Sequence, residues 1–409
     1  MQRLRLPMAL VFLQVFTPKS SAFVGMGGGG VWFNGRGGST TETRSSYPQD
    51  PNGNREYTAL QAWRSAMTED PYGILESWLG PDVCFYRGVF CSYAPEVPIF
   101  ASFRVVSGID LNHANLEGSL VKELALLDHL SFLHLNSNRF SGTVPDSFRE
   151  LHYLSELDLS NNRFSGPFPT STLLIPNLIY LDLRFNSFSG EVPDELFVKD
   201  LDAIFLNNNQ FGGQIPMTLW ASPASVITLA NNQFSGSIPF NFGYMSSRIR
   251  EVLFLNNKLT GCIPEGVGYL TDVEVLDLSF NSLAGHLPSS LSCLSEVEVL
   301  NIAHNQLSGE LPELVCDLRS LANLTVAYNF FSGFSLDCAR LFFRNVWFDF
   351  SGNCIPGSDM QRPPPECMGI PGGGLSCLRI PSTRPLACAG SMGQRDGMNR
   401  VPYTFPSLP

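Results

Sequence analysis

Carboxylates and aromatic rings recur along the middle of this chain at intervals of about 24 residues. Carboxylates pair with lysine and arginine and speed the capture of a basic partner, whereas aromatic rings supply the buried anchors of an interface. The pattern therefore favours binding of a basic, partly apolar peptide. The alternative is that these acids are solvated residues without a ligand, since Arg184 stands close enough to neutralise one of them. The predicted ligand-binding residues are Glu156, Asp158, Tyr180, Asp182, Phe185, Phe205, Asp277, Phe280 and Tyr328.

The same residues allow two catalytic groupings. His134 stands one repeat after Asp110 and one before Asp158, with Ser160 nearby, which is the composition of a Ser/His/Asp triad. Asp158 and Asp182 could serve as paired glycosidase acids, but neighbouring strands would hold them about 5 Å apart on an open face. Neither a nucleophile elbow nor a P-loop, HExxH or CxxC motif occurs in the sequence. The sequence therefore predicts no enzyme, no cofactor and no metal site.

An internal repeat of the form LxLxxNxLxGxIP must position these residues. Its units recur every 23 to 25 residues, and each leading pair of apolar residues alternates as in a short strand. Such a strand cannot bury its apolar face alone, so the units must stack. The sequence predicts an α/β solenoid, a right-handed stack of about eleven coils with a parallel sheet on its concave face. The aligned residues are Ile109, Leu133, Leu157, Leu181, Ile204, Ile227, Val252, Leu276, Leu300, Leu324 and Phe348.

Three polar or turn-forming positions recur after each strand. An asparagine is expected to take up the bend and to bond the backbone of its own and the next coil, a glycine to adopt a left-handed φ, and prolines to stop the return arm from becoming helix. The first coil has Ala114 in place of the asparagine, which suits a terminal coil. The asparagines are 138, 162, 186, 209, 232, 257, 281, 305, 329 and 353; the glycines are 142, 166, 190, 213, 236, 261, 285, 309 and 333; the prolines are 145, 169, 193 and 216.

Composition divides the chain into five segments. Residues 1–22 have the basic start, apolar run and small-residue end of a secretory signal peptide, and residues 23–55 are rich in Gly and Ser. Residues 56–105 predict an N-terminal helical cap, with a helix pair over 57–79 broken at Pro71. The solenoid covers 106–356, and 357–409 forms a C-terminal cap and a Pro/Gly-rich tail without regular structure. No later stretch is apolar enough to span a membrane.

Ten cysteines behind a signal peptide favour disulfides over free thiols. Cys84 and Cys91 are the best pair because the loop between them is short, and the group Cys316, Cys338, Cys354 and Cys367 should close the other end. The net charge is −11, and residues 56–360 alone hold 15 basic and 33 acidic residues, a net −18. That excess disfavours nucleic acid and favours either a cationic partner or simple solubility.

Several stretches are similar to one plant family. ALQAW (59–63), PDVCFYRGVFCS (81–92), LDAIFLNNNQF (201–211) and LTGCIPEGVG (259–268), with the LxGxIP return arm, resemble the plant leucine-rich repeat extensin proteins over about residues 57–367. The resemblance implies plant-type leucine-rich repeats, secretion to the cell wall (apoplast) and, in some members, binding of small cationic cysteine-rich signalling peptides. Only Pro363, Pro364 and Pro365 are similar to the Ser-Pro-rich arrays, which indicates the subgroup lacking the extensin region.

The sequence thus predicts a secreted, non-catalytic cell-wall recognition protein that binds a small cationic peptide or wall protein. One alternative is an inhibitor of a wall-degrading glycosidase such as polygalacturonase. The other is a structural wall component whose basic tail, with Arg379, Arg384, Arg395 and Arg400, contacts pectin. A homodimer and an N-linked glycan on Asn323, in the sequon Asn-Leu-Thr, complete the expectations.

Overall fold

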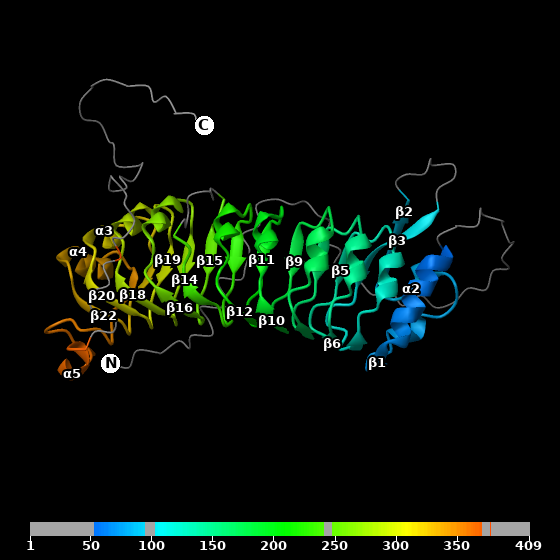
Figure 1. Ribbon diagram of the computed structural model, residues 1–409, viewed down its shortest axis with the longest axis horizontal. Coiled ribbons are helices and arrows are strands. Elements are labelled where there is room, and N and C mark those ends of the chain that lie inside the picture. The colour runs from blue at the N-terminus through cyan, green and yellow to red at the C-terminus, as the bar shows by residue number, and fades with distance from the viewer. Residues whose placement is uncertain (1–52, 95–102, 241–247, 370–376, 378–409) are drawn as a thin grey trace, which may run out of the picture. The chain divides into compact units, whose positions relative to one another are not determined.

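The computed structural model describes residues 53–94, 103–240, 248–369 and 377 (Figure 1). Its largest sheet has 12 strands, of which the first pair is antiparallel and the others are parallel. Each strand is followed by a turn and a return arm, so consecutive coils lie side by side in Figure 1. The strands, in spatial order, are β2 (Val89–Tyr93), β3 (Arg104–Asp110), β5 (Phe132–His134), β7 (Glu156–Asp158), β9 (Tyr180–Asp182), β11 (Ala203–Phe205), β13 (Val226–Thr228), β15 (Glu251–Leu253), β17 (Val275–Asp277), β19 (Val299–Asn301), β21 (Asn323–Thr325) and β23 (Trp347–Asp349).

The register of this sheet is the one that the repeat spacing predicts. Ile109 pairs with Leu133, Leu133 with Leu157, and the series continues strand by strand until Leu324 pairs with Phe348. All eleven of these aligned side chains are buried. Because side chains alternate across a strand, the residues on either side of each buried one lie on the opposite face of the sheet. The leucine-rich repeat solenoid is therefore confirmed.

The chain turns from each strand into a second strand and then into a short helix. The second strands lie in two further sheets. The first sheet begins with β1 (Met67–Glu69), which follows helix α2 and pairs antiparallel with β4, and continues with β4 (Glu117–Ser119), β6 (Arg139–Gly142), β8 (Arg163–Gly166), β10 (Ser187–Glu191) and β12 (Gln210–Gly212). The second sheet holds β14 (Ser235–Ser237), β16 (Lys258–Gly261), β18 (Ser282–His286), β20 (Gln306–Leu311) and β22 (Phe330–Phe334). Eight of the nine glycines expected to be left-handed have positive φ, and Gly333 does not. The difference has a local cause, since the pairing of β20 with β22 shifts its register after Gly309.

The return arms are mostly single turns of 3-10 helix. They are η4 (Lys122–Leu126), η5 (Asp146–Glu150), η6 (Thr170–Leu174), η7 (Asp194–Val198), η8 (Met217–Ala221), η9 (Glu265–Tyr269) and η10 (Ser289–Cys293), followed by α3 (Glu313–Cys316), α4 (Leu336–Ala339) and η11 (Arg340–Phe342). The expectation that the prolines at 145, 169, 193 and 216 prevent helix is wrong. Each immediately precedes a 3-10 helix, because a proline is tolerated where its missing N–H has no helical partner.

The asparagines after the strands form a ladder. In Asn162, Nδ2 donates to the carbonyl oxygens of Leu135 in the preceding coil and Leu159 in its own, and Oδ1 accepts from the backbone N of Phe140. The same three bonds recur for the other nine asparagines, from Asn138 to Asn353. These bonds satisfy backbone groups that the interior would otherwise leave unpaired.

The bend itself lies one residue earlier than expected. The left-handed residue is the one before each asparagine, with φ between 52° and 59° from Ser137 to Tyr328. Asparagine and serine occupy that position in several coils, but phenylalanine, histidine and tyrosine occupy it in four. The ladder asparagine is thus free to satisfy backbone bonds while its neighbour takes the strained conformation.

The N-terminal cap consists of one long helix and a 3-10 turn. Helix α2 (Gly53–Ser65) buries Leu60 and Trp63 against the first coils, and the Trp63 ring stacks on Phe140 at 5.9 Å between centroids. The expectation of a second helix in 57–79 is wrong, because after Pro71 that stretch holds only the 3-10 turn η1 (Leu75–Ser77). The Asp70 carboxylate accepts hydrogen bonds from the backbone N of Ile74 and Leu75 and so satisfies the start of this short turn. The residues after the turn do not continue the helix.

Disulfide bonds close the solenoid at each of its two ends. Cys84, in the 3-10 turn η2 (Val83–Phe85), bonds Cys91, which confirms the pair that the short loop favours. At the other end Cys316 bonds Cys338 and Cys354 bonds Cys367, so the four cysteines expected there do close that end. Two unpredicted features are the bond between Cys262 and Cys377, 115 residues apart, and the disulfide bonding of Cys293.

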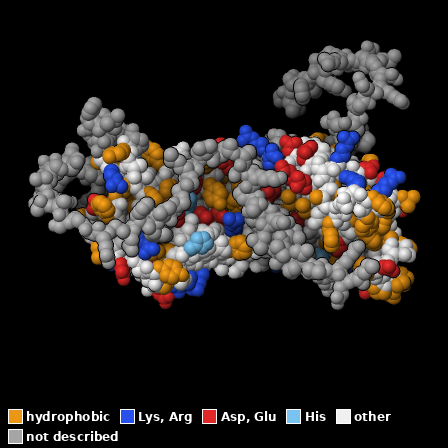
Figure 2. Space-filling view, turned by 180° about the vertical axis from the view of Figure 1, so that it is seen from behind, with side chains coloured by type: hydrophobic (Ala, Val, Ile, Leu, Met, Phe, Trp, Pro, Cys, Tyr) orange, Lys and Arg blue, Asp and Glu red, His pale blue; other side chains and the backbone are white. Residues whose placement is uncertain are grey.

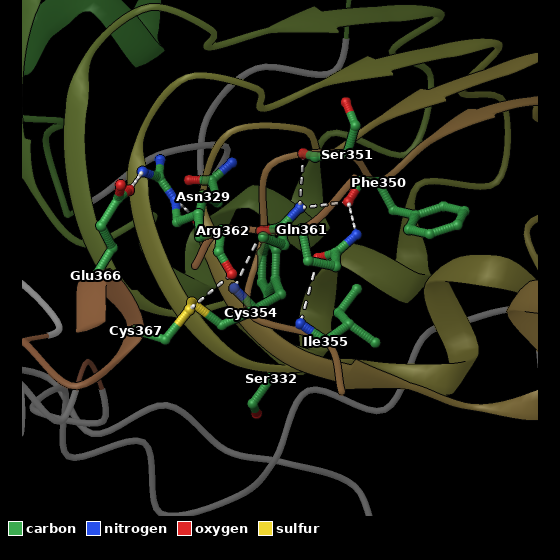
Figure 3. The surroundings of a disulfide bond; sticks show 12 residues. Asn329, Ser332, Phe350, Ser351, Cys354, Ile355, Gln361, Arg362, Glu366 and Cys367 are labelled. Atoms are coloured by element: carbon green, nitrogen blue, oxygen red, sulfur yellow. Dashed lines mark hydrogen bonds and ion pairs between the residues drawn. A yellow bond between two sulfur atoms is a disulfide. The ribbon is translucent and has the colours of Figure 1, made fainter. Parts of the chain in front are cut away.

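The last coil is closed by a loop that ends in α5 (Pro364–Cys367). Figure 3 shows Arg362 between Asn329 and Glu366: its Nε donates to the carbonyl oxygen of Asn329 at 2.9 Å, and a second guanidinium nitrogen lies 3.1 Å from the Glu366 carboxylate. The guanidinium also lies over the Phe330 ring, 4.4 Å from its centroid. This arginine therefore covers the exposed end of the asparagine ladder.

The predicted signal peptide, residues 23–52 of the Gly/Ser-rich segment and all of the tail beyond residue 369 except Cys377 lie outside the described residues. Residues 53–55 of that segment begin helix α2. Within the part of the chain that the structure describes, no helix is long and apolar enough to cross a membrane. The five segment boundaries remain predictions.

Candidate functional site

The solvent side of the 12-stranded sheet, here called the strand face, carries the predicted ligand-binding residues. It has two rows: the first row holds the residue before each buried central residue, and the second row holds the residue after it. A third column, at the left-handed position before each ladder asparagine, holds Phe185, Phe280 and Tyr328. Figure 2, seen from behind, shows Lys and Arg side chains next to Asp and Glu side chains on the surface of the described residues. The net charge of −18 on residues 56–360 therefore does not make the surface uniformly negative.

In the N-terminal part of the first row, aromatic residues stand on both sides of Gly108, which has no side chain. Phe90, Gly108, Phe132, Glu156 and Tyr180 pair in that order across five consecutive strands. A Cβ on Gly108 would lie 2.0 Å from the outer end of the Phe132 ring, so the missing side chain makes room for that ring. The centroids of Phe90 and Phe132 are consequently only 5.8 Å apart although a strand separates them.

Glu156 is the half-exposed acid of this region. Its Oε2 lies 3.0 Å from Nε2 of His134, and 48% of its side chain is accessible. The His134 ring in turn contacts Phe132, with centroids 5.1 Å apart. Glu156 therefore lies between aromatic rings with a carboxylate that solvent still reaches.

Asp182 is engaged within the protein itself, and its role in binding a ligand stays a prediction. Its side chain is fully buried and pairs with Nε of Arg184 at 2.9 Å. The Tyr180 hydroxyl donates to the same carboxylate at 3.3 Å. Burial raises the pKa of Asp182 to about 7, with the nearby Asp158 adding to the rise and Arg184 opposing it. Burial likewise raises the pKa of the Tyr180 phenol. The suspected neutralisation by Arg184 is thus real.

Phe205 completes this closed group. The Arg184 guanidinium lies 4.9 Å from the centroid of the Phe205 ring, and Tyr180 packs on the same ring at 5.9 Å. An arginine here pairs with a carboxylate and lies over an aromatic ring at the same time. Within the protein itself, the strand face thus provides one example of how it can hold a guanidinium group.

Asp158 and Asp277 serve the turns that follow their strands. Oδ1 of Asp158 accepts from the backbone N of Ser160 at 2.9 Å, and Asp277 accepts from the backbone N of Ser279 at the same distance. Both serine hydroxyls also donate to these carboxylates. Burial raises the pKa of Asp277. These two acids therefore bind their own coil first.

The suspected triad is not assembled. Ser160 donates its hydroxyl proton to Asp158, whereas His134 is directed to Glu156. Nδ2 of Asn136 also donates to the Ser160 oxygen. The serine hydroxyl and the imidazole therefore have separate partners, and the geometry offers no activated nucleophile.

The C-terminal part of the strand face carries a stack of three rings. Phe280 and His304 lie 4.1 Å apart between centroids and nearly parallel, and His304 and Tyr328 lie 4.3 Å apart. All three residues have φ between 54° and 56°. Phe280 and Tyr328 are 40% and 48% exposed, and Phe185, in the same column, is exposed with asparagines in the same position of its adjacent coils. This set, Phe280, His304 and Tyr328, is called the outer stack.

Sequence reasoning identifies two of the three rings of the outer stack and misses His304. The signal is present, because His304 stands 24 residues from both Phe280 and Tyr328. A search that treats histidine only as a catalytic group overlooks it. Burial lowers the pKa of His304, which keeps its ring neutral and able to stack at neutral pH.

The predicted glycosylation site lies on the same sheet. Asn323 is the first residue of β21, and its Oδ1 accepts a hydrogen bond from Oγ1 of Thr325 at 3.0 Å. Modification of Asn323 stays a prediction.

Comparison with known families agrees with the repeats. The leucine rich repeat N-terminal domain family matches residues 53–92, and leucine rich repeat families match residues 128–188, 272–294 and 296–318. Pollen-specific leucine-rich repeat extensin-like protein 1 of Arabidopsis thaliana is 67% identical over 154 residues, which are 38% of this chain and 16% of that protein. Leucine-rich repeat extensin-like protein 4 of the same plant is 53% identical over 176 residues, 43% of this chain and 35% of that protein. The matched parts thus span a minor share of these relatives.

Solved structures with the same fold include plant receptor ectodomains. The leucine-rich repeat ectodomain of the Arabidopsis receptor kinase HAESA, solved in complex with an N-terminally extended IDA peptide hormone, has a TM-score of 0.61 and 29% identity. The match covers 73% of this chain and 50% of that one. A TDR receptor gives a TM-score of 0.58 at 29% identity, over 61% of this chain and 43% of that one.

Proposed function

Because the chain belongs to the leucine-rich repeat extensin-like family, we propose that it is a secreted, non-catalytic recognition protein of the plant cell wall. Its ligand is a small cationic, cysteine-rich signalling peptide, held on the strand face. The observation that carries the proposal is the pairing of a solvent-reachable carboxylate, Glu156, with aromatic rings on an otherwise ordered, repetitive surface.

The fold supports this kind of role. A solenoid offers an extended row of side chains from successive coils, and such a surface suits an extended peptide better than a small molecule in a closed pocket. The HAESA ectodomain, at 29% identity, was solved in complex with a peptide hormone. Binding of a peptide by this chain is the corresponding expectation.

The distribution of charge supports a cationic ligand. Residues 56–360 carry a net −18, and Arg184 beside the strand face is already engaged by Asp182. An approaching cationic peptide therefore meets an overall attractive field, whose effect falls with salt. Aromatic side chains such as Phe185 and Tyr328 would supply apolar contact once the peptide is held.

Titration of the full chain with a basic cysteine-rich peptide, at low and at physiological ionic strength, tests the proposal. Glu156→Gln should weaken binding by about threefold to tenfold, because it removes the half-exposed carboxylate. Asp146→Asn is the matched control: it makes the same change of charge at an exposed residue of η5, on a return arm away from the strand face. Equal losses in both variants would mean that only net charge matters, and absence of binding by the wild type would refute the proposal.

A further inference from the structure

We infer that Glu156 and Phe132 form a binding site for an arginine side chain of the ligand. The guanidinium would pair with the Glu156 carboxylate while its flat face lies against the Phe132 ring. This inference rests on the proposed function, and it names the residue type and the place on the strand face by which a cationic peptide is held.

The aromatic side of the site is built by a glycine. Gly108 lies between Phe90 and Phe132 in the first row, and the Phe132 ring occupies the space that a side chain at 108 would fill. Phe90 is 51% exposed, and its ring is tilted against Phe132 at 5.8 Å. Two rings from strands on either side of β3 thus converge over Gly108. Glu156 follows Phe132 in the row on its other side, and His134, which packs on Phe132 and contacts Glu156, links the ring to the carboxylate.

Among the predicted ligand-binding acids of this region, Glu156 offers the most accessible carboxylate to a ligand cation. Asp182 is fully buried under Arg184, and Asp158 is bonded to Ser160. Glu156 keeps almost half of its side chain accessible, and its described contact is with one ring nitrogen of His134. A carboxylate has about four lone-pair directions on two oxygens, so a two-pronged guanidinium contact fits beside that single bond.

The neighbouring closed group supplies the geometric precedent. Arg184 pairs with Asp182 at 2.9 Å and lies 4.9 Å from the Phe205 centroid, so an arginine is held by an acid and a ring together. Glu156 and Phe132 repeat the acid and the ring nearer the N-terminus, where the ligand would supply the arginine. Lysine would pair with the acid but would gain less from the ring, because its ammonium is a compact point charge without a flat face.

The experiment compares two capped peptides, tetra-arginine and tetra-lysine, as probes of the full chain by calorimetric titration. The wild type should bind tetra-arginine about threefold to tenfold more tightly than tetra-lysine. Phe132→Leu keeps an apolar side chain but removes the ring, so it should bring that ratio close to one. Phe132→Tyr should restore the ratio, and Glu156→Gln should weaken tetra-arginine most. Phe343→Leu, an exposed ring that follows the return-arm helix η11, is the control and should change neither.

The outcomes separate this inference from the proposed function. Salt-sensitive binding of both peptides with equal affinity, or an unchanged ratio in Phe132→Leu, overturns the arginine site and leaves the cationic-peptide proposal standing. Failure of the wild type to bind either peptide, or the basic cysteine-rich peptide, overturns both. Thermal unfolding of each variant shows whether it is folded. If Phe132→Leu is misfolded, Phe132→Tyr still tests whether an aromatic ring at this position maintains the ratio.

Discussion

Two series of stacked aromatic rings run along this solenoid, one inside its N-terminal half and one outside its C-terminal half. Inside, Phe140, Phe164, Phe188 and Phe211 stack with nearly parallel rings, 6.1 to 6.3 Å apart. All four are fully buried. Outside, the rings of the outer stack lie closer together, at 4.1 and 4.3 Å, and two of them are 40% and 48% exposed.

The difference lies in their position relative to the asparagine ladder. The inner rings stand two residues after a ladder asparagine, where the chain has turned into the core. The outer rings stand one residue before it, at the left-handed turn on the strand face. A left-handed conformation costs a residue with a side chain roughly 1–2 kcal/mol, so stacking in the outer series must offset strain that the inner series does not have. The same repeat therefore aligns rings for stability in one column and holds them accessible to a ligand in the other.

Removing an inner ring should have the largest effect. Phe164→Ala is expected to destabilise the fold by about 3–5 kcal/mol, because it deletes a fully buried ring and leaves a cavity. Phe164→Leu should cost much less, since leucine fills the equivalent position of later coils at 259, 283 and 307. Equilibrium denaturation measures both. A leucine variant as unstable as the alanine variant would mean that ring stacking, and not apolar volume, sustains the inner series.

The pH dependence of stability should come from the closed group of Tyr180, Asp182, Arg184 and Phe205. Burial raises the pKa of Asp182 from 3.8 to about 7 in the folded chain. A carboxyl that binds its proton more tightly when folded stabilises the fold at low pH and loses that contribution as pH rises through its folded value. Stability of the wild type should therefore decline between about pH 4 and 7, by an amount on the order of a few kcal/mol. Denaturation across that range measures it.

Asp182→Asn should flatten that decline, because its amide does not titrate and still accepts a bond from Arg184. Asp146→Asn, at an exposed acid, should leave the decline as in the wild type. A pH profile equally steep in Asp182→Asn would assign the decline to other groups.

The sequence predicted the scaffold better than the surface. The spacing of the buried leucines and the ladder asparagines follows from strand geometry and from backbone groups that need partners, so register and ladder could be read directly. The bond between Cys262 and Cys377 could not, because 115 residues separate the two cysteines and no short loop brings them together. The burial of Asp182 could not be predicted from the sequence for a related reason. Its burial depends on Arg184 folding back over Phe205, a side-chain arrangement that no periodicity encodes.

The smallest effect tests whether the outer stack contributes to stability at all. Asparagine occupies the same left-handed position at 161, 208, 231 and 256, so Phe280→Asn and His304→Asn each lose stacking but relax the backbone. Each single change should be nearly neutral. The double variant should reveal a coupling of about 0.5–1.5 kcal/mol between the two rings. Phe185→Asn combined with Phe280→Asn is the matched pair without contact, and its effects should add. If the coupling in the stacked pair is no larger than in this control, the backbone alone aligns the outer rings. Stacking would then contribute nothing to the stability of the fold.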